Sequence, residues 1–250
     1  MEFNFTTLLI LSFLMFSVAV LYSSVGHGGA SGYLAVMALF SFAPEMMKPI
    51  ALSLNILVTS IATIKYYRAD QFLWQLFWPF AVTSVPFAFI GGGLKLPGDI
   101  YRDVVGFILL FTAYQLFKTS SWKEPSDYSY RGTSILLSLL IGAGIGLLSG
   151  LTGVGGGIFL SPLLVFLKWA EFCRISGIVA AFILINSISG LLGHWTVVRT
   201  LPEPTLFFAL AVVVGSIIGS ELGSRRLTSP FLKRLLALVL IIAGVKFIFS

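Results

Sequence analysis

Apolar residues dominate the chain in ten stretches that short polar segments separate. Most of the stretches are long enough for a membrane-spanning helix, which needs roughly 20 predominantly apolar residues. In hydrocarbon such stretches become helices, because a helix satisfies all of its backbone polar groups internally. The pattern therefore predicts an all-α integral membrane protein. The stretches are residues 8–25, 30–42, 46–67, 72–92, 104–117, 134–150, 156–167, 172–198, 206–222 and 231–249.

Composition supports this class. Hydrophobic residues make up 57% of the 250 residues and charged residues 10%, with a mean hydropathy of +0.98. Soluble domains carry about 25% charged residues. The net charge of +6 comes from Lys and Arg that lie mostly between the apolar stretches, where basic residues set membrane topology. We therefore expect a lipid bilayer as partner and no nucleic acid. The single cysteine, Cys173, is expected to pack in the interior.

The most hydrophilic part of the chain lies at its centre and divides the apolar stretches into two sets of five. It predicts a first membrane repeat over residues 1–118, a cytoplasmic linker over 119–133 and a second repeat over 134–250. A displacement of 127 residues places three glycines of the first half over three of the second. The order and spacing of the stretches agree as well, which predicts an internal repeat.

The distribution of basic residues predicts the orientation of the chain. If each stretch crosses the membrane once, 5 of the 16 Lys and Arg lie on the side of the N-terminus and 11 on the other side. Basic residues favour the cytoplasm, so both termini are expected outside. Each half crosses an odd number of times, so the second repeat is inverted relative to the first.

A glycine cluster separates the first and second apolar stretches of each half. The second stretch holds about 13 residues and rises roughly 20 Å, less than the roughly 30 Å of the hydrocarbon core. We interpret the paired stretches as broken or re-entrant helices. A helix that starts after such a cluster directs unpaired amides and a positive dipole end towards the membrane centre, which suits an anion. The alternative is that the glycines only permit close helix packing. The candidate binding residues are Gly26, His27, Gly28, Gly29, Ser31, Gly153, Gly155, Gly156 and Gly157.

Neutral polar side chains in the third stretch of each half are further candidates for binding a substrate. Asn55 and Thr59 are four residues apart and share a helix face, and Asn186 and Ser187 lie in the matching stretch. Hydrogen bonds between helices are the alternative role for each of them. His27 is expected either to donate to the anion, to carry a coupling proton, or to serve packing.

Charged and ionisable groups near the ends of the stretches are expected to have simpler roles. Lys95 is interpreted as an anchor at the membrane surface or a lure for anions, and His194 as an interfacial residue. Glu221 is expected to lie in a solvated cluster at the cytoplasmic end of its stretch, together with two arginines that follow it.

An enzyme is disfavoured, because an intramembrane enzyme needs paired catalytic groups at membrane depth. The sequence has no Asp pair, no His-x-x-x-His pattern and no Gly-x-Ser-x-Gly motif in these stretches. We expect a secondary transporter for a small anion, without a cofactor or a bound metal. An importer or channel for another anion and a purely structural membrane subunit remain as alternatives, since helices do not encode the direction of transport.

The run GIGLLSGLTGVGGGIFLSP at residues 144–162 resembles the motif of the TauE/SafE family of sulfite and organosulfonate exporters. That family has a duplicated hydrophobic chain of similar length with a glycine-rich, proline-followed motif in each half, so the resemblance covers nearly the whole chain. The first half departs from the motif at His27, Ala30 and Ala35. The resemblance implies export of sulfite, sulfoacetate or related organosulfonates across a bacterial inner membrane. We expect alternating access with the site at the interface of the two halves, and proton coupling as one option.

Overall fold

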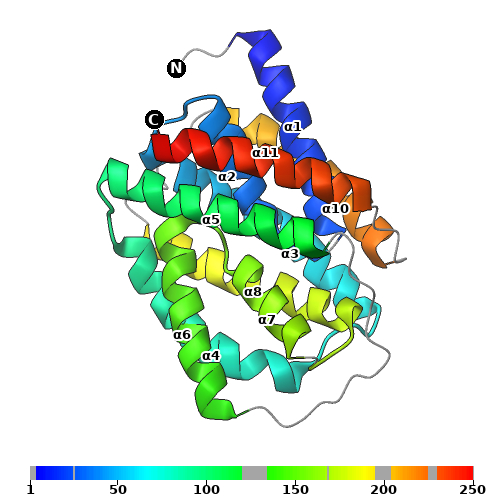
Figure 1. Cartoon of the computed structure of the whole chain (residues 1–250). Coiled ribbons are helices and arrows are strands. Elements are labelled where there is room, and N and C mark those ends of the chain that lie inside the picture. Colours follow the sequence, from blue (N-terminus) through cyan, green and yellow to red (C-terminus); the bar gives the residue numbers. More distant parts are fainter. Residues whose placement is uncertain are drawn as a thin grey trace.

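The computed structural model describes residues 4–24, 26–119, 134–167, 169–194, 204–224 and 230–249, and all regular elements in these residues are helices (Figure 1). The predicted all-α class is confirmed. The predicted linker lies outside the described residues from position 120 onwards. The helices are α1 Phe5–Ser23, α2 Ala30–Leu39, α3 Pro44–Arg68, α4 Trp74–Gly93, α5 Gly98–Thr119, α6 Ile135–Thr152, α7 Gly157–Phe166, α8 Phe172–Gly193, α10 Pro204–Ser224 and α11 Pro230–Phe249.

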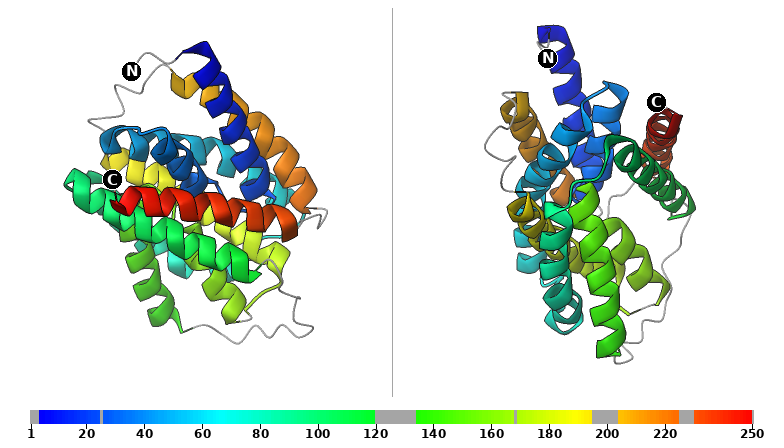
Figure 2. Two further views of the ribbon diagram at one scale, coloured as in Figure 1. Left: turned by 45° about the horizontal axis from the view of Figure 1, so that its top comes forward. Right: turned by 90° about the vertical axis from the view of Figure 1, so that its left-hand side faces the viewer.

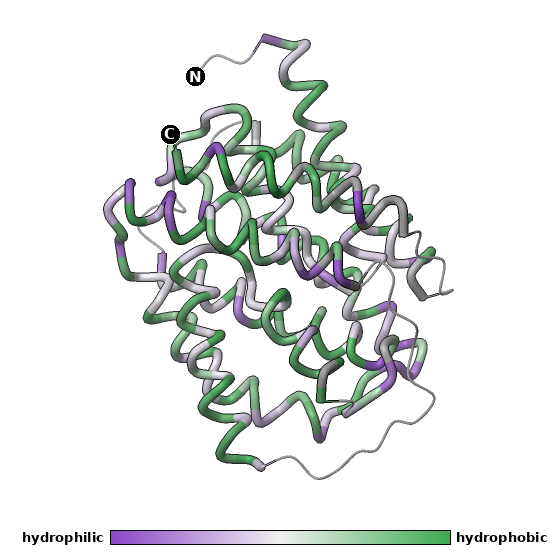
Figure 3. Tube along the Cα trace, viewed as in Figure 1, coloured by the Kyte–Doolittle hydropathy of each residue, from purple (hydrophilic) through white to green (hydrophobic). Residues whose placement is uncertain are grey.

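Six of these helices are long and apolar enough to cross a membrane, namely α1, α3, α4, α6, α8 and α10. Hydrophobic residues follow the helices along their length, and hydrophilic residues gather towards helix ends (Figure 3). Large apolar side chains also lie on the surface, as Leu136 and Leu140 of α6 do with exposed fractions of 67% and 65%. Such surfaces are suited to lipid contact, so the chain is a multi-pass membrane protein.

Helix α5 begins six residues earlier than the apolar pattern predicts, at Gly98 instead of residue 104. Asp99 lies in its first turn, where a carboxylate is stabilised by the positive end of the helix dipole. The charged residues of this turn ended the apolar stretch without ending the helix. Hydropathy therefore located the membrane part of α5 and missed its start.

The long helices pack as pairs that each join one helix before residue 120 to one after residue 133. The most extensive contacts are α4 with α6, α1 with α10, α5 with α11, α3 with α8 and α4 with α8. Figures 1 and 2 show α5 and α11 side by side along one face of the molecule. The central helices are α3 and α8, which are the most buried of the candidate spans.

Glycines set the spacing of the α4–α6 pair. Gly142, Gly146 and Gly150 lie one turn apart on α6 and face the carbonyl oxygens of Phe80, Ser84 and Ala88 on α4. A methyl group at any of the three would collide with the facing carbonyl. The α1–α10 pair repeats the arrangement, with Gly215 against the Phe16 carbonyl and Gly219 against the Val20 carbonyl. Small residues that let backbones approach are a main source of helix association in membranes.

This packing predicts that Gly150→Val lowers the thermal stability of the purified protein. The added side chain forces α4 and α6 apart, and overpacking of this kind costs about 1–3 kcal/mol. Gly144→Val is the matched control, because no atom lies within 4 Å of the position its side chain would enter. Thermal unfolding in detergent measures both, and equal melting temperatures would contradict the role of the close contact.

Candidate functional site

The two glycine clusters form two helix breaks that share left-handed glycines at two matched positions, and the second break has one more at Gly155. In the first break, between α1 and α2, Gly26 and Gly29 have φ angles of +73° and +91°. In the second break, between α6 and α7, Gly153 and Gly156 have φ angles of +81° each. These left-handed conformations favour glycine because it has no Cβ. The predicted interruptions are therefore present, at positions 127 residues apart.

The second break leaves a run of backbone amides without partners. The hydrogen bonds of α7 begin with the amides of Phe159 and Leu160, which both donate to the Gly156 carbonyl. Among the residues that the structure describes, no acceptor takes a hydrogen bond from the amides of residues 154–158. Unpaired amides at a helix start carry the positive end of the helix dipole, which is the electrostatic requirement for holding an anion.

The carboxamide of Asn55 lies between the two breaks. A Cβ at Gly28 would come within 2.5 Å of Asn55 Oδ1, and a Cβ at Gly155 within 2.6 Å of Asn55 Nδ2. Asn55 Nδ2 also donates to the Val154 carbonyl at 3.5 Å and to Ser187 Oγ at 3.4 Å. One buried side chain of α3 thus touches both breaks and α8, and it requires glycine on either side.

The orientation of this carboxamide follows from its partners. A backbone carbonyl only accepts hydrogen bonds, so the amino group of Asn55 must face Val154 and its oxygen must face Gly28. That oxygen is fully buried and has no hydrogen-bond partner in the described residues. Leaving a buried acceptor unpaired costs about 1–3 kcal/mol. The oxygen therefore needs a donor such as water, because an anion offers only acceptors.

The structure brings together five of the residues that the sequence singled out, and these are Gly28, Asn55, Thr59, Gly155 and Ser187. Thr59 contributes its methyl group beside Gly28, and its hydroxyl donates to the main-chain carbonyl of Asn55 at 2.6 Å. Ser187 contributes its hydroxyl. We call this set the Asn55 cluster.

The other candidates lie around the Asn55 cluster with contacts of their own. Gly26 packs against Ser176 and Gly153 against Lys48. Ser31 shares a hydrogen bond of 2.6 Å with Tyr22, and both are buried. The remaining candidates complete the two breaks and α8. Gly29 lies against Tyr33, Gly156 against Phe182 and Gly157 against Ile183, while Asn186 donates to the Phe182 carbonyl of its own helix at 2.8 Å.

His27 lies inside the first break and is partly buried. Its backbone amide donates to the Tyr22 carbonyl at 2.8 Å, and its ring meets the Tyr22 ring edge-on with centroids 6.4 Å apart. The residue is therefore held at the end of α1.

A charged group that the sequence treated only as a topology signal is buried near the second break. Lys48 of α3 is 5% exposed, and its ammonium donates to the Gly92 carbonyl at 2.8 Å and to the Gly91 and Leu94 carbonyls at 3.4 Å. The signal was its position inside an apolar stretch, where an ionisable residue is a functional candidate by default.

His194 contacts the same carbonyl. Its Nδ1 lies 3.2 Å from the Gly92 oxygen, and because a carbonyl only accepts, Nδ1 carries the proton. Burial, with the charge of Lys48 nearby, lowers the pKa of His194 below its ordinary value. The expectation of an interfacial histidine was incomplete, since the side chain is buried and joins the end of α8 to the end of α4.

Lys48 and His194 line a pocket of about 360 Å³, which we call the Lys48 pocket. It lies where α3 and α5 begin, and where α4 and α8 end. The lining residues are Pro44, Glu45, Lys48, Leu94, Lys95, Leu96, Pro97, Gly98, Tyr101, Leu151 and His194. In the described part of the chain, no group of three His, Cys, Asp or Glu is placed to hold a metal ion.

Comparison with known proteins places this chain among membrane transporters. The family described as sulfite exporter TauE/SafE matches residues 11–247, nearly the whole chain. The chain belongs to the TauE/SafE family. It is 36% identical over 237 residues to a probable membrane transporter protein, y4hK, of Sinorhizobium fredii (strain NBRC 101917 / NGR234), covering 94% of this chain and 96% of that protein.

A second relative of this TauE/SafE transporter comes from an archaeon. It is the probable membrane transporter protein MJ0441 of Methanocaldococcus jannaschii, 27% identical over 264 residues, covering 98% of this chain and 97% of that protein. No solved structure shows a significant match to the chain. The family and both relatives are membrane transporters, so the protein is a transporter and not an enzyme, as the absence of catalytic pairs predicted.

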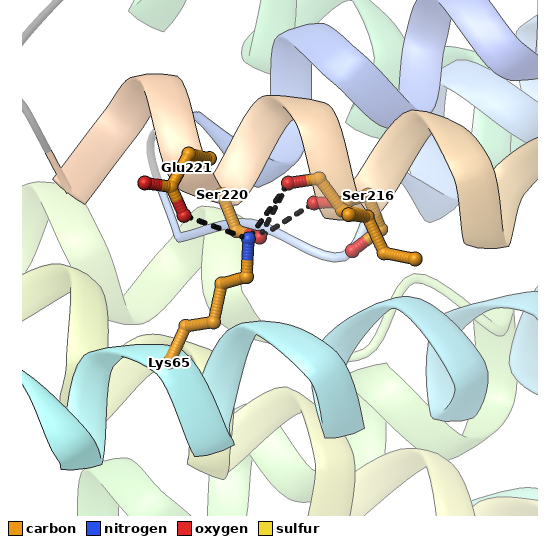
Figure 4. A network of polar contacts seen from close by, with 5 residues as sticks. Lys65, Ser216, Ser220 and Glu221 are labelled. Carbon is orange, nitrogen blue, oxygen red and sulfur yellow. Dashed lines mark hydrogen bonds and ion pairs between the residues drawn. The ribbon is translucent and has the colours of Figure 1, made fainter.

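A second polar connection in the TauE/SafE chain joins α3 to α10 (Figure 4). Lys65 of α3 donates to the Ile217 carbonyl at 2.8 Å and forms an ion pair with Glu221 at 3.2 Å. One turn earlier on α10, Ser216 donates to the Val58 carbonyl at 3.1 Å. Glu221 was expected in a solvated cluster. It is half exposed, and it also forms the ion pair with Lys65 of α3.

The unpaired oxygen of Asn55 leads to a prediction about stability. Asn55→Leu keeps the side-chain volume, removes the orphaned acceptor and loses only two long hydrogen bonds. We expect the free energy of unfolding of the TauE/SafE protein to change by no more than about 1 kcal/mol, because removing the orphaned acceptor offsets the cost of leaving the Val154 carbonyl and Ser187 Oγ without this donor. Thermal unfolding in detergent is the measurement, and a large loss of stability would show that Asn55 serves the fold instead.

Proposed function

We propose that this TauE/SafE transporter exports small sulfur-containing anions, such as sulfite, sulfoacetate or related organosulfonates, by alternating access at the Asn55 cluster. The membership of the family supports the substrate class. The observation that carries the location is the contact of Gly28 and Gly155, from different breaks, with one carboxamide. The bilayer centre has few other ways to hold an anion without a fixed positive charge.

The chemistry of the proposed site is that of neutral hydrogen-bond donors in a low-dielectric surrounding. The unpaired amides of the second break supply donors and the positive end of the α7 dipole. Asn55 Nδ2 and Ser187 Oγ supply two more. The bonds that Asn55 Nδ2 now makes are 3.4 and 3.5 Å long, so an oxyanion displaces weak interactions when it binds.

The proposed architecture is two repeats of opposite orientation, residues 1–118 and 134–250, joined by a cytoplasmic linker. The helix pairing supports it, because each pair contains one helix from either repeat. If the two repeats are exchanged, the α1–α10 pair maps onto the α6–α4 pair. The α3–α8 and α5–α11 pairs each map onto themselves. Inverted repeats with a site at their interface are a common plan for secondary transporters.

Sidedness and coupling complete the proposal. The charge pattern supports an orientation with both termini outside, which is the periplasm if the protein lies in a bacterial inner membrane, as the family resemblance implies. In this orientation the Lys65–Glu221 pair lies on the cytoplasmic side, where contacts between α3 and α10 must open to admit substrate. The membrane potential alone favours loss of an anion from the cell. His27 is the nearest candidate for a coupled proton.

Flux through proteoliposomes tests the site. Gly28→Ala and Gly155→Ala should each lower the efflux of loaded sulfoacetate or sulfite by about tenfold or more, because the new Cβ displaces Asn55 and a 1 Å misplacement can cost about a hundredfold. At Gly155 the φ of +85° adds backbone strain. Asn55→Leu should lower efflux while leaving stability intact.

Gly144→Ala is the control for this test, because it adds a methyl group to α6 at an open position. Normal efflux in both Gly28→Ala and Gly155→Ala would place the transport site elsewhere. The rival assignments, an importer or a channel, are separated by counterflow. A carrier shows accelerated exchange when unlabelled anion is present on the opposite side, and a channel does not. Imposed gradients of either sign then give the preferred direction.

A further inference from the structure

The Lys48 pocket has features that the proposed central site does not use. It is open to the surface, holds about 360 Å³ and is lined by parts of several helices. Sites for small molecules begin at about this volume. We infer that the Lys48 pocket is a second binding site, specific for small oxyanions. This inference rests on the proposed function, because the pocket lies between the Asn55 cluster and the side that the charge pattern predicts to be outside.

Charge is the first argument for an anionic ligand. Two ammonium groups, those of Lys48 and Lys95, line the pocket against the single carboxylate of Glu45. Lys48 is almost completely buried, so its charge acts through a medium of low dielectric constant. Two of its three hydrogen bonds to carbonyl oxygens are 3.4 Å long, and an oxyanion in the pocket can share this ammonium group.

Two helix starts form the second argument. Pro44 is the first residue of α3 and Gly98 the first of α5, and both residues line the pocket. A helix start carries the positive end of the dipole and unpaired amides. A Cβ at Gly98 would meet no atom within 4 Å, so the backbone of this turn is open to a ligand. Glu45 and Asp99 lie in the first turns of these helices and offset part of the positive field, so the dipoles reinforce the lysines only in part.

The position of the pocket gives the third argument. Leu151, near the end of α6, lines it, and Tyr101, another lining residue, donates its hydroxyl to the Thr152 carbonyl at 3.1 Å. The second break begins at the next residue, Gly153, which lies against the Lys48 backbone. One wall of the pocket is therefore the end of the break whose unpaired amides belong to the central site. An anion leaving that site on this side meets the Lys48 pocket next.

Binding to the full-length protein in nanodiscs tests the inference. Methanesulfonate is the probe, because it keeps its charge and is chemically stable. Lys95→Glu reverses an exposed charge at the pocket, and we expect it to weaken binding by about tenfold or more. The affinities of the wild type and of the variant should both depend on ionic strength. Lys118→Glu is the matched control, since it makes the same change of charge on an exposed lysine at the other end of α5.

The two sites are separated by a variant of the central one. In Gly155→Ala, the binding of methanesulfonate to the Lys48 pocket, measured by calorimetry, should persist. Adding Lys95→Glu should still weaken it. Equal affinities in Lys95→Glu and Lys118→Glu would overturn the inference, while a loss of efflux in Gly155→Ala would leave the proposed function standing. Unchanged efflux in Gly28→Ala and Gly155→Ala, together with weaker binding in Lys95→Glu, would overturn the proposed function and keep the pocket as an anion site.

Discussion

The constraint that shapes this protein is that hydrocarbon offers no partner for an exposed backbone group. A chain that interrupts two helices inside a membrane must cover both interruptions with protein or with a polar cavity. The most buried long helices, α3 and α8, meet this requirement. They pack against each other and against the short helices α2 and α7 that follow the breaks. Asn55 on α3 touches both breaks. One carboxamide therefore links the parts of the chain that are hardest to accommodate in lipid.

The periphery solves a different problem, which is how to hold apolar helices together when lipid is as apolar as they are. The α4–α6 and α1–α10 pairs do so with rows of glycine against carbonyl oxygens. In the α5–α11 pair, Gly106 and Gly244 each face the carbonyl of the other. Dispersion and close backbone contact then replace the hydrophobic effect as the source of association. The many large apolar side chains on the outer faces remain available to lipid.

Much of this arrangement could be predicted from the sequence. Runs of apolar residues located the ten helices of the described residues, and the displacement of 127 residues located both breaks, because glycine is favoured where φ is positive. Asn55, Thr59 and Ser187 were singled out by their place in the third stretch of each half and lie against the breaks, whereas Asn186, singled out with them, bonds within its own helix. The start of α5 was missed because charged residues at a helix start lower hydropathy without disfavouring the helix.

The role of Lys48 was missed for a related reason. Its charge was counted for topology, and only the fold shows that its ammonium reaches the end of α4, more than forty positions away along the chain. Tyr101 was also missed, since a tyrosine in a membrane helix is common and its bond to the Thr152 carbonyl connects two helices that are distant in sequence. Contacts of this kind depend on packing angles, which periodicity does not encode.

The glycine rows have an evolutionary consequence. When two side chains fit together, a larger residue on one helix can be accommodated by a smaller one on its partner. At Gly146 and Gly150 the nearest atoms of the partner helix are all main chain, and no substitution can make a peptide carbonyl shorter. A larger residue at Gly146 or Gly150 therefore cannot be accommodated by a smaller side chain opposite, whereas the faces turned towards lipid carry no such restriction.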